Sequence, residues 1–95
     1  MEERQAFFLK EKPVMALVTL RRNRQEMYGS IVSKKIDTTY AHTIKILAQM
    51  EDENLIRREK QGRKNVLELT EEGKSCADKF IEIMESLQKT DQILK

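Results

Sequence analysis

Apolar side chains recur along this chain at spacings that change from helical to extended and back to helical. The first stripe begins after Pro13, which suits the first turn of a helix because its missing N–H would be unpaired there. The members of the stripe are Val14, Leu17, Val18 and Leu20. Spacings of three and four residues are typical of a helix with one buried face, so we expect a helix that ends between Arg22 and Arg24.

A short helix is predicted after the turn at residues 27–30. Ser30 is a candidate N-cap, because its hydroxyl can accept a hydrogen bond from a backbone N–H group of the first turn. Val32 and Ile36 lie four residues apart and therefore share one side of this helix. We expect the short helix to run from Ser30 to Ile36.

A longer helix is predicted from Thr38 to about Asp52. Asp37 is the expected N-cap, since its carboxylate can accept from the first N–H groups and complement the helix dipole. The core-facing stripe of this helix is Thr43, Ile46, Leu47 and Met50. Asn54 follows, and asparagine tolerates the left-handed conformation that ends many helices.

Residues 55–69 change to the pattern of a β-hairpin. Leu67 and Leu69 lie on one face of a strand, and Gly62 can adopt positive φ in the turn at residues 61–64. The hairpin carries five cations, which are Arg57, Arg58, Lys60, Arg63 and Lys64. A hairpin of this size is marginal alone, so its apolar side is expected to pack on the flanking helices while its charged tip meets a polyanion.

The last helix is expected to run from about Glu71 to Gln92, capped by Thr70, over a length of roughly 33 Å. One seam, at alternating steps of four and three, contains the apolar residues Cys76, Phe80, Ile83, Leu87 and Leu94, with Thr90 between the last two. A second stripe contains Ala77, Ile81 and Met84. A single small domain does not need both stripes, so we expect the distal half to pack against the same helix of a second subunit.

The N-terminal residues 1–12 form a further apolar element, either a dimer arm or a packing arm. Phe7, Phe8 and Leu9 are adjacent there, in a short helix expected between Arg4 and Lys10. The expected dimer interface comprises Phe7, Phe8, Phe80, Ile83, Leu87 and Leu94. The alternative is that the last helix folds back on the core of its own subunit.

Composition limits the possible functions. The 95 residues suffice for one domain, and a hydrophobic fraction of 39% with 36% charged residues describes a globular chain. Residues 21–64 contain eleven Lys or Arg against six Asp or Glu, whereas residues 65–95 contain four against seven. The middle of the chain therefore favours an anionic partner, and the C-terminal part points away from that partner.

Several classes of site are not expected. A single cysteine, Cys76, and a single histidine, His42, exclude an internal disulfide and any multi-cysteine zinc site. The sequence contains no catalytic cluster and no phosphate-binding glycine loop, so we expect neither an enzyme nor a cofactor. No apolar run approaches the roughly 20 residues of a membrane span and the start lacks a signal-peptide pattern, so we expect a cytoplasmic protein without membrane association.

The order helix, short helix, turn, helix, cationic hairpin, helix is that of a winged helix-turn-helix. Three segments carry a closer resemblance: residues 35–43 (KIDTTYAHT), 47–56 (LAQMEDENLI) and 66–74 (VLELTEEGK). They resemble the helix-turn-helix, the "LE-x-x-G-L-I" exit and the "V-x-L-T-x-x-G" passage of MarR-type and related archaeal winged-helix regulators. Asn54 replaces a common glycine, and the wing lacks the family's "D-x-R" signature.

The resemblance implies a mainly α fold with a small β-hairpin (α+β) and a long C-terminal dimerisation helix. It places one domain over residues 1–95, with the helix-turn-helix and wing at 14–69 and the C-terminal helix at 70–95. It also implies sequence-specific binding of double-stranded DNA by a homodimeric transcriptional regulator. The recognition helix would enter the major groove and the basic wing would contact the phosphate backbone.

Residue by residue, this hypothesis assigns two sets of contacts. The expected recognition residues are Thr38, Thr39, Tyr40, His42 and Lys45. The expected backbone and wing contacts are Ser30, Lys34, Lys35, Arg57, Arg58, Lys60, Arg63 and Lys64. Because the turn of the wing is short, we expect Arg63 and Lys64 to bind phosphates rather than to read bases.

Other interpretations stay open at this point. Tyr40 can be a core-edge residue, and the cations Arg21, Arg22 and Arg24 can be a solvated helix end. Winged helices also serve as protein-interaction or architectural chromatin modules, because a fold alone does not determine function. The operator, the regulated genes, the sign of regulation and any small-molecule effector are not specified by the sequence, and neither is a redox role for Cys76.

Overall fold

The computed structural model describes the backbone of residues 1–94 and the side chains of residues 1–88. The elements in chain order are α1 (Glu3–Phe8), α2 (Glu11–Arg22), α3 (Gly29–Lys35), α4 (Tyr40–Asp52), β1 (Ile56–Gln61), β2 (Lys64–Leu69) and α5 (Glu71–Leu94). The mainly helical fold with one antiparallel hairpin, expected from the sequence, is confirmed.

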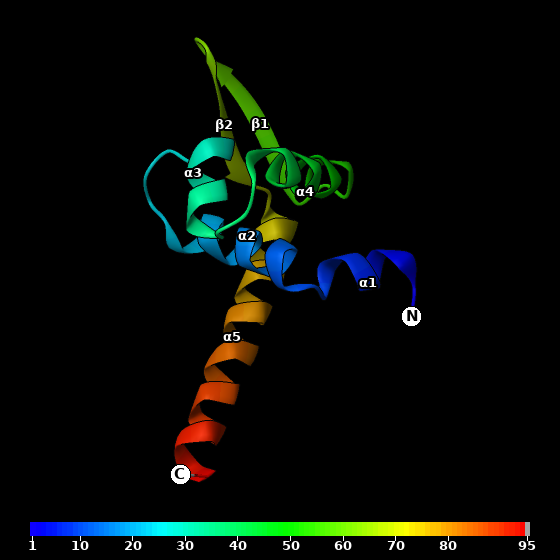
Figure 1. Ribbon diagram of the computed structural model, residues 1–95, viewed down its shortest axis with the longest axis vertical. Coiled ribbons are helices and arrows are strands. Elements are labelled where there is room, and N and C mark those ends of the chain that lie inside the picture. Colours follow the sequence, from blue (N-terminus) through cyan, green and yellow to red (C-terminus); the bar gives the residue numbers. More distant parts are fainter. Residues whose placement is uncertain (95) are drawn as a thin grey trace.

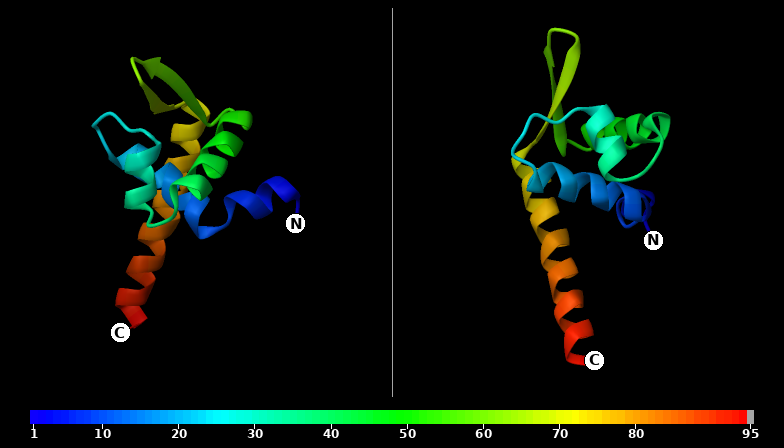
Figure 2. Two further views of the ribbon diagram at one scale, coloured as in Figure 1. Left: turned by 45° about the horizontal axis from the view of Figure 1, so that its top comes forward. Right: turned by 60° about the vertical axis from the view of Figure 1, so that its left-hand side comes forward.

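The molecule is elongated because its two ends project in opposite directions. The hairpin extends from one end of a helical body formed by α2, α3 and α4, and α5 crosses α2 before its distal half leaves the body at the other end (Figure 1). Two further views show the same separation (Figure 2). The principal extents are 50 × 31 × 27 Å. At 1.5 Å per residue, the 24 residues of α5 span about 36 Å.

The core lies where α2, α4, the base of the hairpin and the first turns of α5 meet. Leu17, Val18 and Leu20 of the predicted α2 stripe are buried, and Val14 is half-buried. The predicted stripe of α4 is also buried, and it consists of Thr43, Ile46, Leu47 and Met50. Ala77 of α5 is fully buried against them. Periodicity therefore identified the buried face of each of these helices.

Two predicted caps are wrong. Ser30 is the second residue of α3, which begins after Tyr28 and has no side-chain cap. Thr39, not Asp37, caps α4, because its Oγ1 accepts a hydrogen bond from the His42 N–H at 3.1 Å. Asp37 instead has a φ of +53° and reverses the chain directly after the buried Ile36. The left-handed conformation is one that aspartate tolerates, and α4 consequently starts at Tyr40 rather than at Thr38.

The hairpin has the predicted extent and turn. Ile56 pairs with Leu69 at its base and Gln61 with Lys64 at its tip, so Gly62 and Arg63 form a two-residue loop. Gly62 has the expected positive φ, +63°. A third extended segment anchors the base, because the Leu67 N–H donates to the Met27 carbonyl at 2.7 Å.

A compact joint connects the end of α4, the hairpin and α5. Asn54 has the predicted left-handed conformation, with a φ of +60°. The Thr70 hydroxyl donates to the Asn54 carbonyl at 2.7 Å and accepts from the Gly73 N–H at 3.0 Å, so Thr70 caps α5 as expected. The Thr70 N–H also donates to the Leu55 carbonyl at 3.0 Å. This carbonyl lies so close to Gly73 that a Cβ atom there would be 2.9 Å from the carbonyl carbon and even closer to the oxygen.

Among the described residues, no helix is both long enough and apolar enough to cross a membrane.

Candidate nucleic-acid interface

The first turns of α4 present polar side chains to solvent. Thr39, Tyr40, His42 and Lys45 are exposed, whereas Thr38 is half-buried in the turn before the helix. Tyr40 is 58% exposed, and one edge of its ring lies against the start of α3, where a Cβ atom at Gly29 would be 3.2 Å from Tyr40 Cε1. The residues expected to face a partner are therefore available on the surface of α4, although Thr38 and Thr39 precede the helix itself.

The end of α3 adds two cations beside this surface. Lys34 and Lys35 occupy the last turn of α3 and are exposed, and Ser30 is exposed near its start. The Ser30 carbonyl accepts a hydrogen bond from the Ser33 hydroxyl at 2.9 Å. The Ser30 hydroxyl does not cap α3, because the helix begins one residue earlier.

The cations of the hairpin fall into two groups. Four are exposed, and these are Arg57, Lys60, Arg63 and Lys64. Arg58 is half-buried, and its Nε lies 3.4 Å from Glu51 Oε1 in the last turn of α4. That separation is an ion pair but not an aligned hydrogen bond, because Arg58 Nε has no hydrogen-bond partner among the described atoms. Arg58 thus connects the hairpin to α4.

A cavity of about 290 Å³ lies between the start of α3, the start of α4 and the hairpin. Its cations are Arg58, Arg63 and Lys64, and its hydroxyl groups come from Tyr28, Ser30 and Tyr40. Among the side chains of residues 1–88, no carboxylate lines this cavity. The structure therefore brings together residues of α4, α3 and the hairpin that the sequence placed in separate lists.

Tyr28 is a site residue that sequence reasoning missed. The Lys64 ammonium lies 5.0 Å from the centroid of the Tyr28 ring, within the range of a cation–π interaction. The two residues are 36 positions apart in the chain, so no local pattern links them. The signal available in the sequence was an aromatic residue directly before a predicted helix.

Of the three cations that could form a solvated helix end, Arg21 has a specific partner, and Arg22 and Arg24 are exposed. Arg21 binds Asp78 of α5 through two hydrogen bonds, Nε to Oδ1 at 2.8 Å and Nη2 to Oδ2 at 3.2 Å. The hydrogen bond from Arg21 lowers the pKa of the Asp78 carboxyl, and its partner carboxylate raises the pKa of Arg21. This contact joins α2 to α5 on the side away from the hairpin tip.

The residues expected at a dimer interface are divided between core and surface. Phe8 is only 8% exposed and lies in the core of its own subunit, and Phe7 packs edge-to-face on it with ring centroids 4.8 Å apart. Ile83 and Leu87 on the distal part of α5 are 56% and 65% exposed, and Phe80 is half-buried. The side chain of Leu94 lies outside the described residues. The N-terminal residues therefore act as a packing arm in this subunit.

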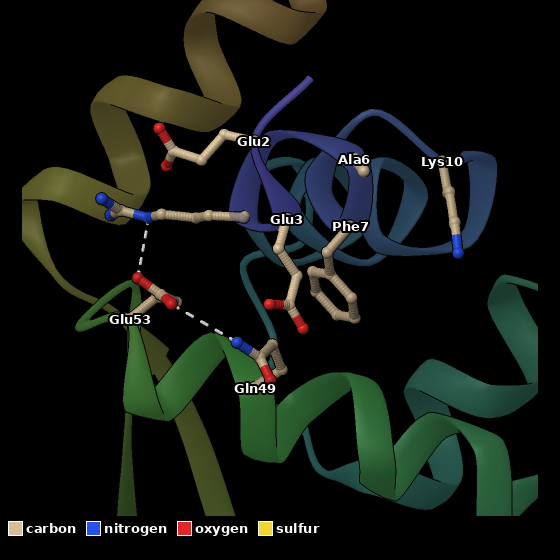
Figure 3. Close-up of a pocket in the computed structure, with 8 residues that line it drawn as sticks. Glu2, Glu3, Ala6, Phe7, Lys10, Gln49 and Glu53 are labelled. Atoms are coloured by element: carbon tan, nitrogen blue, oxygen red, sulfur yellow. Dashed lines mark hydrogen bonds and ion pairs between the residues drawn. The ribbon is translucent and has the colours of Figure 1, made fainter.

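A second hollow, of about 610 Å³, separates α1 from the end of α4. Arg4 Nε is 2.7 Å from Glu53 Oε2 there, and Gln49 Nε2 donates to Glu53 Oε1 at 3.3 Å. Figure 3 shows the Phe7 ring and the Gln49 side chain facing the space between the two helices. Glu2 and Glu3 also line this hollow, so it lacks the uniform positive charge of the cavity beside the hairpin.

Cys76 and the acidic residues offer no further chemistry. Burial raises the pKa of the Cys76 thiol, which disfavours the reactive thiolate. Among the described side chains, no three His, Cys, Asp or Glu residues come together as metal ligands.

No protein family and no curated protein sequence matches this chain. Several solved structures are similar to this chain. AF1382 from Archaeoglobus fulgidus is 22% identical over 90% of this chain and 97% of its own, with a TM-score of 0.79. MepR, a transcription regulator of the Staphylococcus aureus multidrug efflux pump MepA, is 18% identical over 96% of this chain and 69% of its own, with a TM-score of 0.83.

MepR has also been crystallised as a complex with DNA. That structure is 20% identical over 94% of this chain and 75% of its own, with a TM-score of 0.75. Similarity at this level of identity establishes the arrangement of the elements. The chain therefore has the winged-helix fold that the MarR-type resemblance predicted, with β1 and β2 as its wing.

Proposed function

We propose that this protein binds double-stranded DNA in a sequence-specific manner as a dimeric transcription regulator. The observation that carries the proposal is the cavity shared by α3, α4 and the wing, in which the exposed Tyr40 of α4 adjoins Arg63 and Lys64 and no described carboxylate lines the wall. A polyanion that follows this surface would meet hydrogen-bonding groups on α4 and cations on the wing. The DNA complex of MepR supports the proposal, because MepR shares the fold.

In this proposal, α4 enters the major groove, which is about 12 Å wide and admits one helix. Tyr40, His42 and Lys45 project from its first turns, and the Thr39 hydroxyl retains its proton for donation while its oxygen caps the helix. These groups can contact base edges, including thymine methyl groups. They would therefore determine the sequence preference.

The wing and the end of α3 provide the phosphate contacts. The contributing cations are Lys34, Lys35, Arg57, Lys60, Arg63 and Lys64. Each phosphate that is neutralised releases condensed counterions, so the logarithm of the binding constant is expected to fall by about 0.9 per logarithmic unit of salt for each contact. Steep salt dependence is thus a direct consequence of the proposed interface.

The distal half of α5 is proposed to form the dimer. Ile83 and Leu87 expose large apolar side chains on a helix that extends beyond the body of the fold (Figure 1). A second copy of α5 would cover both residues across a two-fold axis. Two recognition helices would then face half-sites about one turn of DNA, roughly 34 Å, apart.

The function is tested by selecting bound sequences from a random duplex pool and then measuring affinity at several salt concentrations. We expect enrichment of a pseudo-palindromic site. The slope of the logarithm of the binding constant against the logarithm of the salt concentration should become shallower by about 1.8 when Arg63 and Lys64 are both replaced by alanine. Lys79→Ala, on the exposed surface of α5, is the matched control and is expected to leave the slope unchanged. Failure to bind any duplex at 50 mM salt would refute DNA binding and favour a protein-interaction module.

The oligomeric state is tested by light scattering after size-exclusion chromatography. One chain has a mass of 11.2 kDa, and we expect twice this value at micromolar concentration. Leu87→Glu, together with Ile83→Glu, should yield the monomer while leaving the helical content of the body intact. A wild-type monomer under these conditions would contradict the dimer.

A further inference from the structure

The cavity between α3, α4 and the wing has the size and charge of a site for one small anion. Its volume, about 290 Å³, is at the lower limit of pockets that hold drug-sized molecules but is ample for a phosphate group. Three other hollows of the described surface each contain carboxylates, for example Glu68 beside Arg57 and Glu71 beside Lys74. Arg63 and Lys64 have no carboxylate partner among the described residues that line this cavity, and this feature distinguishes the cavity beside the wing.

Lys64 is held in this cavity by an aromatic ring. It is the first residue of β2, directly after the two-residue loop, where a lysine side chain would otherwise sample many rotamers. Its ammonium group instead lies 5.0 Å from the centroid of Tyr28, the residue that precedes α3. Because the ring face is electron-rich, it fixes the position of the cation while leaving its charge unneutralised. Tyr28 thus restrains the cation without competing with an anion for it.

Arg58 supplies a second cation in the cavity wall. Its Nε is buried and has no hydrogen-bond partner among the described atoms, although Glu51 Oε1 lies 3.4 Å away. Because this Nε has almost no accessible surface and faces Glu51, Arg58 adds positive charge to the wall of the cavity rather than a donor that a ligand reaches. Arg63 contributes a third cation from the loop.

We propose that this cavity binds a single phosphate of the DNA backbone, and that Tyr28 is the positioning residue that holds Lys64 against it. The inference rests on the proposed DNA-binding function and assigns one contact within it. The DNA strand that follows α4 toward the wing would place one phosphate between Lys64 and Arg63. Free phosphate has the same chemistry, and the test below separates the two sources.

The first arm is a double-mutant cycle between Tyr28 and Lys64, measured on a duplex selected from a random pool. Lys64→Ala should make the salt slope shallower by about 0.9. Tyr28→Leu should weaken binding about two- to fivefold, the range of an exposed cation–π contact, whereas Tyr28→Phe keeps the ring face and should bind as the wild type does. In the Lys64→Ala background, Tyr28→Leu should have no further effect.

Lys60 provides the matched control for this cycle. It is an exposed wing cation outside the lining of the cavity. Lys60→Ala should therefore make the salt slope shallower, and its loss of binding free energy should simply add to that of Tyr28→Leu. Circular dichroism verifies that each variant is folded. If Tyr28→Leu does not fold, Tyr28→Met replaces it in the cycle.

The second arm identifies the source of the phosphate. A single neutral methylphosphonate is placed in turn at each backbone position of the duplex. At one position per half-site it should weaken DNA binding by the wild type and leave binding by Lys64→Ala unchanged. In parallel, inorganic phosphate at constant ionic strength is titrated into the free protein, and no saturation is expected below about 10 mM. The cavity would be assigned to free phosphate instead if two results occurred together. Phosphate binding would saturate below this concentration in the wild type but not in Lys64→Ala, and no methylphosphonate position would weaken DNA binding.

The outcomes separate this inference from the function on which it rests. If the wild type binds no duplex, DNA binding itself is refuted. If the wild type binds and Tyr28→Leu acts independently of Lys64→Ala, only the positioning role of Tyr28 is overturned.

Discussion

Replacement of Gly73 by alanine is expected to loosen the joint between the wing and α5. A Cβ atom at this position would lie 2.9 Å from the Leu55 carbonyl carbon, still closer to its oxygen, and 3.1 Å from Leu69 Cδ2. The carbonyl belongs to the backbone and cannot rotate away as a side chain can. The Leu55 carbonyl must therefore move away from α5, and this movement breaks the hydrogen bond that it accepts from the Thr70 N–H.

The magnitude follows from three effects of Gly73→Ala. Forcing an extra group into a packed site typically costs 1–3 kcal/mol, and the contact here belongs at the upper end of that range. Loss of the Thr70 hydrogen bond costs about 1 kcal/mol more, whereas alanine recovers about 1 kcal/mol of helix propensity. We therefore expect the free energy of unfolding to fall by about 2–3 kcal/mol, and the melting temperature by roughly 10–20 °C.

Urea and thermal unfolding of Gly73→Ala, followed by circular dichroism at one fixed protein concentration, measure this loss. The concentration is held constant because dimerisation would raise the apparent stability. Ser75→Ala is the matched control, since it introduces the same residue at an exposed position of the same helix, and its effect should stay within about 0.5 kcal/mol. If Gly73→Ala is as stable as Ser75→Ala, the steric argument is incorrect.

Three further predictions concern single side chains. Thr70→Ala removes the hydroxyl that contacts both Asn54 and Gly73, and unfolding measurements should show a loss of about 1–2 kcal/mol that Thr70→Ser largely restores. Asp78 has a lowered pKa in the folded state, so its contact with Arg21 stabilises the fold above the unfolded carboxyl pKa of about 3.9, and this contribution disappears as the pH falls further. The difference in unfolding free energy between wild type and Asp78→Asn should accordingly be constant near neutral pH and shrink below about pH 4, and a pH-independent difference would contradict this. Tyr40→Ala should reorder the sequences selected from a random pool without changing the salt slope, because Tyr40 is exposed on α4 and supplies no cation that neutralises a phosphate.

Local patterns were sufficient for much of this fold. The buried stripes, the left-handed Asn54 and the turn at Gly62 each depend on residues close in sequence, and all were predicted correctly. Thr70 was also identified as a cap, although its second hydrogen bond, to a residue 16 positions away, was not foreseen.

The errors and omissions depend on long-range packing. Asp37 and Thr39 are both good N-cap residues, and the burial of Ile36 decides between them because it fixes where the chain must reverse. The contact of Tyr28 with Lys64 joins segments that meet only in the folded state. The contact of Arg21 with Asp78, at a separation of 57 residues, is of the same kind.

The joint at Thr70 and Gly73 fixes the wing to a single continuous helix, so α5 acts as a lever whose other end is the proposed dimer contact. Over its length of about 36 Å, a 10° change in the angle between two α5 helices would change the separation of the two wings by roughly 6 Å. This distance is close to two base-pair steps of DNA, which are about 3.4 Å each. Substitutions at the distal contact, far from any base, would thereby alter which half-site spacing the protein accepts.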